Sequence, residues 1–446
     1  MSSHRMEETG MKQQNQQNLS DAAFAQEGSQ ARARLMSLFD ESTFVEIDRL
    51  VCYQDTPAGV VAGYGTVEGC PVYAFAQDRS VRLGAVGKAE ADKIRKIYEL
   101  AAQNGAPVVG IFDSDGAKLE QGIDALDSIA EILLASNNIS GVVPQIAVVA
   151  GACVGSASVV AANADIVVAV KGTDYYLNPG DGNEAADILA ESADAAVKKA
   201  RALIALLPSN NLSPPLSYDS EDGAMRECSG VINVIEAVAD AGSLIVLGEG
   251  VNKTALARVD GVVCGLVALS ETRLSQAEAS RIARFVRLCD GFSIPVVTFV
   301  DFEGFDSVKG AAQLSHAYAE ATTVKITVVA GKAYGAAYIA VAGKPAGADV
   351  VLAWPSAVIL PLPPEAAIHI FWQERLKELD NPVEGRKKLA EEYAKTEGNA
   401  VSAAQKGYVT DVIPQDETKS KLSAVLDMMS GKRVSRLPKK HSNILL

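Results

Sequence analysis

The sequence contains one folding pattern twice, and this internal repeat limits the possible folds more than any other feature of the chain. Residues 145–151 (QIAVVAG) lead into 153–157 (CVGSA), as an apolar strand leads into a turn of small residues. The same pattern returns 180 residues later, as KITVVAG at 325–331 followed by AYGAA at 333–337. Solenoid units span only about 20–50 residues. The repeat therefore predicts two domains of one fold.

The strands on either side of each turn are also duplicated. An Ala-Asp-apolar strand follows each turn, with the sequences ADIVV at 164–168 and ADVVL at 348–352. A strand that ends in aspartate precedes each turn, with the sequences PVVGIFD at 107–113 and PVVTFVD at 295–301. Amphipathic helices, such as the one expected at about 89–104, alternate with these strands. That alternation is typical of an α/β fold with a mostly parallel sheet.

Two further elements are expected from local patterns. Alternating residues between 60 and 75, with Glu68 and Gly69 at the centre, predict a β-hairpin. The stretch at about 365–396 carries alternating acids and bases and is expected to be an exposed pair of helices.

Composition bounds the class of protein. The chain has 446 residues, of which 48% are hydrophobic and 22% charged, so it can bury two full cores. Its net charge of −14 argues against a nucleic-acid surface, which needs a basic patch. The basic run from Lys432 to His441 is either a solvated tail or a local anion-binding cluster.

Cysteine use and hydropathy indicate the compartment. The six cysteines contain no Cys-x-x-Cys pair, so we expect buried free thiols in a reducing cytoplasm instead of disulfides or a zinc site. No apolar run approaches the roughly 18 residues that a membrane span needs. We therefore expect a cytoplasmic protein that does not itself span a membrane.

A proline-rich segment marks the expected domain boundary. Residues 207–215 (LPSNNLSPP) combine three prolines with Ser and Asn, as a turn-rich linker does. The expected organisation is a polar, flexible tail at 1–28, an N-terminal domain at 29–215 and a C-terminal domain at 216–446.

The two duplicated turns are the best candidates for chemistry. Where a strand meets a helix, the first backbone N–H groups have no partner within the helix. Small side chains let a ligand oxygen approach such donors closely, which is the construction of an oxyanion hole. Tight packing of helix on strand is the alternative explanation for the small residues, and the sequence alone leaves both open.

Other chemistry finds less support. The four histidines have no Cys or acid at metal-ligand spacing, so no metal ion is expected. No Gly-x-Ser-x-Gly elbow, P-loop or dinucleotide-binding glycine motif follows a strand. Two of the expected strands are followed by acids, namely Asp113, Asp115, Asp301 and Glu303. These acids could be catalytic bases, but we expect them to cap helices.

Many short motifs, in order along residues 31–446, resemble the carboxyltransferase subunits of biotin-dependent acyl-CoA carboxylases and decarboxylases, a family that includes the propionyl-CoA carboxylase β subunit and the methylmalonyl-CoA decarboxylase α subunit. The motifs that carry this resemblance are FVEID (44–48), VAGYGTV (61–67), GAPV (105–108), DS (113–114), GIDAL (122–126), LPSNN (207–211), ARFVRLCD (283–290), YAEAT (318–322), KAYG (332–335), AWP (353–355) and KHSNI (440–444).

The resemblance implies two tandem crotonase-like domains in a homo-oligomer, between a dimer and a hexamer. It implies transfer of a carboxyl group between carboxybiotin and a short-chain acyl-CoA, with propionyl-CoA and methylmalonyl-CoA, or acetyl-CoA and malonyl-CoA, as the pairs. The N-terminal domain would hold the coenzyme A thioester, and the C-terminal domain of a partner copy would hold biotin.

The resemblance also assigns roles to residues. Backbone N–H groups would stabilise the acyl enolate in the first domain and the biotin oxygen in the second; the residues are Gly155, Ser156, Ala157, Gly335, Ala336 and Ala337. Further residues would contact biotin in the second domain: Tyr334, Tyr338 and Ile339. A last set would contact the acyl-CoA in the first domain: Gly151, Gly116 and Lys118.

The chain differs from the family pattern at named positions. Ser156 stands where the family has a second glycine, and Asp115 and Lys118 replace a Gly and an Arg. Ile339 stands where an acid is common. The loop after Asp301 is shorter than usual.

The chain contains no Met-Lys-Met biotinylation site and no ATP-binding motif. The expected partners are therefore a separate biotin carboxyl carrier protein and either a biotin carboxylase or a membrane decarboxylase subunit. Three alternatives stay open: the α subunit of a sodium-pumping decarboxylase, a non-catalytic degenerate subunit, and a crotonase-type hydratase. A hydratase would need two active-site acids in one domain, and no such pair stands out in the sequence.

Overall fold

A computed structural model describes residues 28–53, 56–180, 186–220, 223–228, 230–231, 233–248, 250–377, 382–435 and 437–444. The chain divides into two compact units, Met1–Ser213 and Pro214–Leu446. This division lies inside the expected linker, slightly before the boundary expected at 215/216. Apart from Gly28, the expected tail lies outside the described residues.

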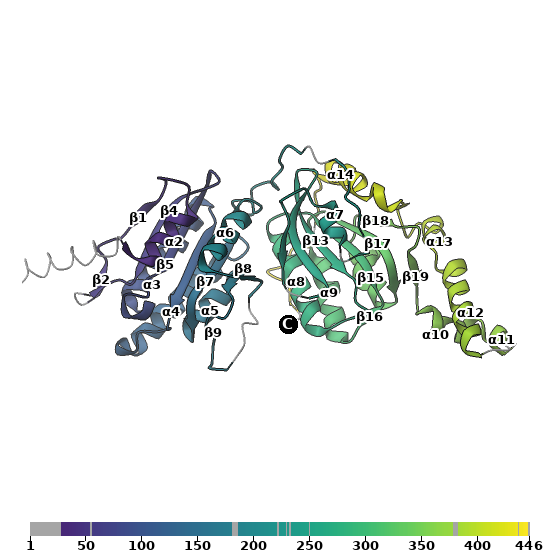
Figure 1. The fold of residues 1–446 in the computed structure, drawn as a ribbon, viewed down its shortest axis with the longest axis horizontal. Coiled ribbons are helices and arrows are strands. Elements are labelled where there is room, and N and C mark those ends of the chain that lie inside the picture. The colour runs from purple at the N-terminus through teal and green to yellow at the C-terminus, as the bar shows by residue number, and fades with distance from the viewer. Residues whose placement is uncertain are drawn as a thin grey trace, which may run out of the picture. The chain divides into compact units, whose positions relative to one another are not determined.

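The first unit is built on one mostly parallel sheet with the order β1-β4-β5-β6-β7-β8-β10 (Figure 1). Its strands are β1 (Val45–Ile47), β4 (Val60–Val67), β5 (Cys70–Gln77), β6 (Val108–Ser114), β7 (Gln145–Val154), β8 (Ile166–Val170) and β10 (Ile188–Ala190), and the short β9 (Tyr175–Tyr176) pairs with the end of β7. The expected hairpin is confirmed, since β4 and β5 are antiparallel and Glu68 and Gly69 turn with positive φ.

The second unit repeats this topology strand for strand, with the order β11-β12-β13-β15-β17-β18-β20. Its strands are β11 (Ile245–Leu247), β12 (Lys253–Val259), β13 (Val262–Leu269), β15 (Val296–Phe302), β17 (Lys325–Tyr334), β18 (Val350–Ala353) and β20 (Asp411–Val412), and the short β19 (Val358–Leu360) pairs with the end of β17. The α/β class and the duplication expected from the repeat are confirmed.

Helices cover the two sheets. In the first unit they are α2 (Gln30–Leu38), α3 (Lys88–Asn104), α4 (Ile123–Asn138), α5 (Ser156–Ala162) and α6 (Ala193–Ile204). In the second they are α7 (Val234–Val238), α8 (Gln276–Gly291), α9 (Val308–Glu320), α10 (Pro364–Phe371), α11 (Gln373–Lys377), α12 (Pro382–Glu397), α13 (Ala400–Gln405) and α14 (Thr418–Met429). None of the helices in the described part of the chain is long and apolar enough to cross a lipid bilayer.

Sequence patterns explain where these helices begin, end and pack. In α3 the residues Ile94, Ile97 and Tyr98 repeat at helical spacing and are all buried. The helix ends where Gly105 adopts a left-handed conformation, φ 61 and ψ 44, as helix C-termini often do. At the start of α8, Ser275 and Glu278 form a reciprocal capping box.

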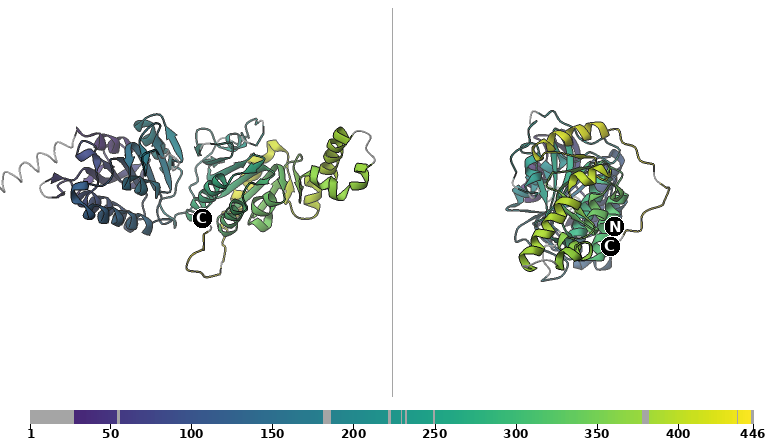
Figure 2. Two further views of the ribbon diagram at one scale, coloured as in Figure 1. Left: turned by 90° about the horizontal axis from the view of Figure 1, so that it is seen from below. Right: turned by 90° about the vertical axis from the view of Figure 1, so that its right-hand side faces the viewer.

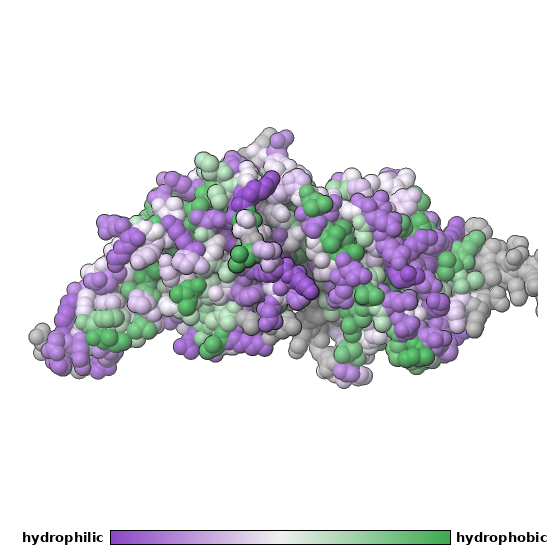
Figure 3. Space-filling view, turned by 180° about the vertical axis from the view of Figure 1, so that it is seen from behind, coloured by the Kyte–Doolittle hydropathy of each residue, from purple (hydrophilic) through white to green (hydrophobic). Residues whose placement is uncertain are grey.

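Both sheets are covered on their two faces. Every residue of β6 is buried, although neighbouring side chains point to opposite faces of a sheet. Helices must therefore cover both sides, as is usual for parallel sheets. Some large apolar side chains stay exposed, and Figure 3 shows hydrophobic residues scattered among hydrophilic ones on one face of the molecule.

The segment expected as two exposed helices contains three, α10, α11 and α12. They form a small core of their own with Tyr334 and Leu360 at the end of the second sheet. In this core the rings of Trp372 and Tyr393 pack edge to face, with centroids 5.1 Å apart. Figures 1 and 2 show that this helical segment extends away from the sheet of its unit.

Each sheet has an irregularity next to its duplicated turn, where an aspartate lies beside a glycine. The strand register shifts after Phe112 in the first unit and after Val300 in the second. A Cβ on Gly151 would come within 2.2 Å of Asp113 Oδ1, and a Cβ on Gly331 within 2.2 Å of Asp301 Oδ1. Both glycines are therefore required by close packing.

The cap role favoured for the strand-end acids is wrong, because their carboxylates bind other groups. Asp113 pairs with Arg34 at 2.8 Å, and Asp115 pairs with Arg79 at 2.7 Å. In the second unit, Asp301 accepts the backbone N–H of Lys332, and Glu303 pairs with the Lys332 ammonium at 2.6 Å. These are tertiary contacts between strand ends, loops and helices.

Two other expectations are only partly right. Three thiols are buried as expected, and burial raises their pKa; they belong to Cys153, Cys264 and Cys289. Cys52, in contrast, is exposed. The C-terminal basic run is also partly tied down, because Lys432 pairs with Asp349 at 2.7 Å.

The carboxylate of Asp40 joins three parts of the first unit. It accepts hydrogen bonds from the backbone N–H groups of Glu68 and Gly69 in the hairpin turn, and from the hydroxyl of Thr66 in β4. Arg201 of α6 lies 2.9 Å from the same carboxylate. These contacts, with the Gly69 bond the largest, lower the pKa of Asp40 from 3.8 to about 2.

Substitution of either packed glycine should destabilise its unit. We expect Gly151→Ala and Gly331→Ala each to lower the free energy of unfolding by about 1–3 kcal/mol, because an aspartate held by tertiary contacts must move. Chemical denaturation measures this, with Gly431→Ala as the control, since a Cβ at Gly431 meets open space. Unchanged stability in both variants would contradict the packing argument.

Asp40 should stabilise the protein only when it is ionised. Because the pKa of Asp40 is lower in the folded than in the unfolded protein, its ionised form stabilises the fold. This stabilisation is fully present above about pH 4 and is lost as the pH falls through about 2. Asp40→Asn should therefore melt at a lower temperature than the wild type at pH 7. The difference should shrink between pH 4 and pH 2, whereas Glu41→Gln should change little at either pH. A difference that stays constant with pH would refute this role.

Candidate active site

The first duplicated turn is fixed by one glycine. Gly155 connects β7 to α5 with φ 59 and ψ −131, a conformation that costs other residues energy. Its N–H donates to the carbonyl of Tyr176 in β9 at 3.0 Å. The next two residues, Ser156 and Ala157, open α5, where a helix has no carbonyl one turn earlier for its N–H groups.

The second turn has the same construction. Gly335, with φ 43, follows β17, and its N–H donates to the carbonyl of Leu360 in β19 at 3.0 Å. Ala336 and Ala337 come next, before a π-helical turn over Tyr338–Ala342. In each unit the glycine is held by the short strand that pairs with the end of the long one.

These bonds narrow the set of expected donors. The N–H groups of Gly155 and Gly335 are used by backbone carbonyls and do not point to a ligand. The donors left at the two turns are those of Ser156 and Ala157 and those of Ala336 and Ala337. Of these four residues, Ser156 and Ala336 line a cavity, whereas Ala157 and Ala337 are buried and do not.

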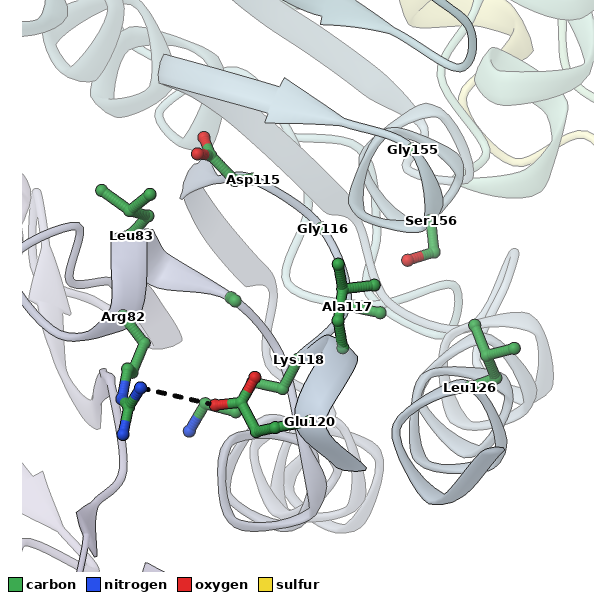
Figure 4. A pocket seen from close by; sticks show the side chains of 12 residues that line it. Arg82, Leu83, Asp115, Gly116, Ala117, Lys118, Glu120, Leu126, Gly155 and Ser156 are labelled. Atoms are coloured by element: carbon green, nitrogen blue, oxygen red, sulfur yellow. Dashed lines mark ion pairs between the residues drawn. The ribbon is translucent and has the colours of Figure 1, made fainter. Parts of the chain in front are cut away.

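A cavity of about 700 Å³ opens beside the first turn (Figure 4). It is lined by Arg82, Leu83, Ala85, Asp115, Gly116, Ala117, Lys118, Leu119, Glu120, Leu126, Gly155 and Ser156. Gly116 has φ 99, and a Cβ there would lie 3.1 Å from the Val154 carbonyl. This close approach brings the loop that follows β6 against the turn.

Two residues expected to contact the acyl-CoA have structural partners. The Lys118 ammonium lies 2.7 Å from Glu90 in a buried ion pair. Glu90 also accepts the backbone N–H groups of Gly59 and Gly87, so the pair holds the cavity wall to α3. Gly151 does not line the cavity, because it packs against Asp113.

A strained turn forms another part of the wall. Arg82 and Leu83 have φ of 51 and 55, next to Gly84 with φ 68. Left-handed backbone costs a residue other than glycine roughly 1–2 kcal/mol. Gly84 itself is required, since a Cβ there would lie 2.0 Å from the Asp113 carbonyl.

The cavity contains two acids that the sequence did not single out as a pair. Asp115 pairs with Arg79, and Glu120 lies 3.9 Å from Arg82. In Figure 4 both acids lie away from Ser156. The structure thus places two acids at one cavity, with each carboxylate facing an arginine.

A second cavity, of about 640 Å³, opens beside the second turn. It is lined by Gly335, Ala336, Tyr338, Ile339, Ile359, Leu360, Pro361, Tyr393, Glu397, Asn399, Ala403, Lys406 and Tyr408. Of the residues expected to contact biotin, Tyr338 and Ile339 line it. Burial raises the pKa of Tyr338.

Tyr334 does not line this cavity. Its ring is 4% exposed and packs in the small core of α10 and α12. Burial, with nearby Glu303 and Glu365, raises the pKa of Tyr334 to about 12, so its hydroxyl stays protonated.

Sequence reasoning missed the outer walls of both cavities. In the first unit these include Arg82, Leu83 and Glu120, and in the second Tyr393 and Tyr408. A weak local signal in the first unit was Gly84, a residue type that tolerates the positive φ of 68 found at this turn. Across the described ranges, no group of three or more His, Cys, Asp or Glu side chains could hold a metal ion.

Comparison with known proteins agrees with the two-unit architecture. The family model described as "Carboxyl transferase domain" matches residues 24–180 and 181–444. A solved structure of transcarboxylase 12S, described as a hexamer assembly with hydrolysed methylmalonyl-coenzyme A bound, superposes with a TM-score of 0.86. It is 30% identical and covers 100% of both chains.

Curated relatives are similar over nearly the whole chain. The methylmalonyl-CoA decarboxylase subunit alpha of Propionigenium modestum is 34% identical over 93% of each chain. The methylmalonyl-CoA carboxyltransferase 12S subunit of Propionibacterium freudenreichii subsp. shermanii is also 34% identical, over 93% of this chain and 91% of the relative. The propionyl-CoA carboxylase beta chain of Saccharopolyspora erythraea is 33% identical, over 93% of this chain and 90% of the relative.

The twin units, the matched turns and these similarities agree with one another. The chain belongs to the carboxyl transferase domain family of enzymes.

Proposed function

We propose that this chain is a biotin-dependent acyl-CoA carboxyltransferase subunit, which moves a carboxyl group between carboxybiotin and a short-chain acyl-CoA. The observation that carries the proposal is the pair of matched turns. Each turn brings its glycine and the next residue to the wall of a cavity, and family membership supplies the reaction class.

The first cavity is proposed to hold the acyl-CoA. The N–H groups of Ser156 and Ala157 would donate to the thioester oxygen, which gains negative charge when the α-proton leaves. The rest of the wall is partly apolar, through Leu83, Leu119 and Leu126. Such a wall suits a short acyl chain and the pantetheine arm.

The second cavity fits the fused rings of biotin. Its lining is mainly apolar and aromatic, through residues such as Tyr338 and Ile339. Polar and charged groups are also present, namely Asn399, Glu397 and Lys406. Bound carboxybiotin would supply the carboxyl group. The N–H groups of Ala336 and Ala337 would stabilise an oxygen that gains negative charge there.

We also propose that the active form is a homo-oligomer. Large apolar side chains at or near both cavities are exposed in the single chain, among them Leu119 at 88%, Ile123 at 74% and Ile339 at 70%. Exposed apolar side chains mark an interaction site where they gather into one patch. The similar transcarboxylase 12S structure is described as a hexamer assembly, which supports the proposal.

The partners and the direction of transfer follow from the same proposal. A biotin carboxyl carrier protein in the cytoplasm would bring biotin to the second cavity. The relatives include both a decarboxylase α subunit and a carboxylase β chain, so a membrane decarboxylase subunit or a biotin carboxylase would set the direction.

One observation favours a hydratase as a second candidate, because Asp115 and Glu120 both line the first cavity. Water addition to an enoyl-CoA needs two such acids, whereas carboxyl transfer needs neither. Measured hydration of crotonyl-CoA, lost in Asp115→Asn and Glu120→Gln, would favour the hydratase. Carboxyl transfer from malonyl-CoA or methylmalonyl-CoA to free biotin would favour the transferase.

Blocking either turn should abolish transfer without unfolding the chain. Ser156→Val and Ala336→Val place a branched side chain beside the donors, and a lost oxyanion donor costs about a hundred- to a thousand-fold in rate. Both positions have helical backbone, whereas Gly155 and Gly335 would be strained by any substitution. Transfer to free biotin measures the loss, thermal melting reports folding, and Ala336→Gly is the matched control. Rates above about a tenth of the wild type would count against the proposal.

Mixing these two inactive variants tests whether copies share a site. If the first unit of one copy works with the second unit of another, a mixed dimer has one site with both turns intact and one with both turns blocked. About half of the dimers in a co-refolded mixture are mixed, so the mixture should regain about a quarter of the wild-type rate. No recovery, in a mixture shown by mass spectrometry to contain mixed oligomers, would place both turns of a site in one chain.

Ser156 separates a working enzyme from a degenerate subunit. Its N–H does not depend on its side chain, and Ala336 shows that the equivalent turn accepts a Cβ. We therefore expect Ser156→Gly to change the transfer rate by less than about ten-fold. A wild type inactive with malonyl-, methylmalonyl- and glutaconyl-CoA, but active as Ser156→Gly, would show that the hydroxymethyl group had blocked the site.

A further inference from the structure

The left-handed turn over Arg82 and Leu83 has no part in the proposed reaction. Strained backbone of this kind is concentrated at functional sites, where surrounding contacts hold it in place. Those contacts are present: the Leu83 carbonyl accepts the N–H of Asp115 at 3.1 Å, and the N–H of Val86 donates to Gly116 at 2.8 Å. The fold thus fixes the turn to the cavity wall.

The charges of the cavity make Arg82 distinctive. Two cations line the cavity, and the Lys118 ammonium is held in its buried pair with Glu90. The Arg82 side chain is 63% exposed, and its ion pair is with Glu120, 56% exposed, at 3.9 Å. Such a long, solvated pair is weak, so the guanidinium can exchange this carboxylate for another anion.

A local cation matters here because the whole chain is acidic. With a net charge of −14, the protein repels anions unless positive charge lies at the binding site. A guanidinium offers paired N–H donors that match a phosphate or a carboxylate. In Figure 4, Arg82 and Ser156 lie on opposite sides of Ala117, in the lining of one cavity.

We propose that Arg82 binds an anionic group of the acyl-CoA substrate at the mouth of the first cavity, where the ligand displaces Glu120. This inference rests on the proposed function and deepens it. The anion is either a phosphate of coenzyme A or the free carboxylate of a dicarboxylic acyl group, which present the same chemistry to the guanidinium.

Calorimetric titration with malonyl-CoA tests the proposal without any need for turnover. Arg82→Gln should weaken binding about five-fold, as expected for one solvated charge-assisted contact, and Arg82→Lys should keep part of the affinity. Glu120→Gln should instead tighten binding about two-fold, because the competing carboxylate is gone. In the double variant with Arg82→Gln, the Glu120→Gln change should not tighten binding, because the arginine for which the carboxylate competes is absent. Arg95→Gln is the matched control, since Arg95 of α3 is a half-exposed arginine outside the cavity lining.

Truncated ligands identify the anion. If the partner is a phosphate, Arg82→Gln should bind malonyl-CoA and propionyl-CoA more weakly but malonyl-pantetheine normally. If it is the acyl carboxylate, both malonyl thioesters should bind more weakly and propionyl-CoA normally. Equal affinities of Arg82→Gln and the wild type for all three ligands would overturn the inference alone. A wild type that binds no acyl-CoA would overturn the proposed function as well.

Discussion

The hydrogen bond from a left-handed glycine to a short accessory strand is the constraint on which both turns depend. It joins Gly155 to Tyr176 in one unit and Gly335 to Leu360 in the other, each at 3.0 Å. Because the glycine uses its own N–H for this bond, the next donors come from the residues that follow it, and of these Ser156 and Ala336 line the cavities. A residue with a Cβ would be strained at the same place. The bond therefore sets both the direction of the backbone and the identity of the donors.

Contacts beneath the turns keep this geometry fixed. The aspartate at the end of each central strand, Asp113 or Asp301, occupies the space that a side chain on the facing glycine would need. In the first unit, Arg34 pairs with that aspartate, and the buried pair of Lys118 with Glu90 holds the neighbouring loop. Removing one partner of a buried pair costs more than the pair contributes, since the other charge is left without compensation. The turn and its neighbouring loop are thus held in place by ion pairs.

Much of the fold could be predicted because it depends on local periodicity and on duplication. Continuous apolar runs located the central strands, and the repeat at residues 145–151 and 325–331 fixed their equivalence. The walls of the cavities could not be found in this way. Lys118 meets Glu90 across 28 residues, and Tyr393 and Tyr408 reach the second turn from far along the chain. The cap role predicted for the strand-end acids was wrong for the same reason. A cap is a local interaction, whereas the partners of these acids, such as Arg34, are distant in sequence.

The two units share one scaffold but differ around their turns. Duplication kept the parts from which the proposed oxyanion sites are built, namely the strand, the glycine and the accessory strand. It did not keep the walls. The first cavity carries charged residues such as Arg82, Asp115 and Glu120, whereas the second is lined mainly by apolar and aromatic residues such as Tyr338 and Ile339. The first wall carries charges of both signs, whereas aromatic rings are part of the second. The backbone is thus common to the two units, and the side chains around it distinguish their cavities.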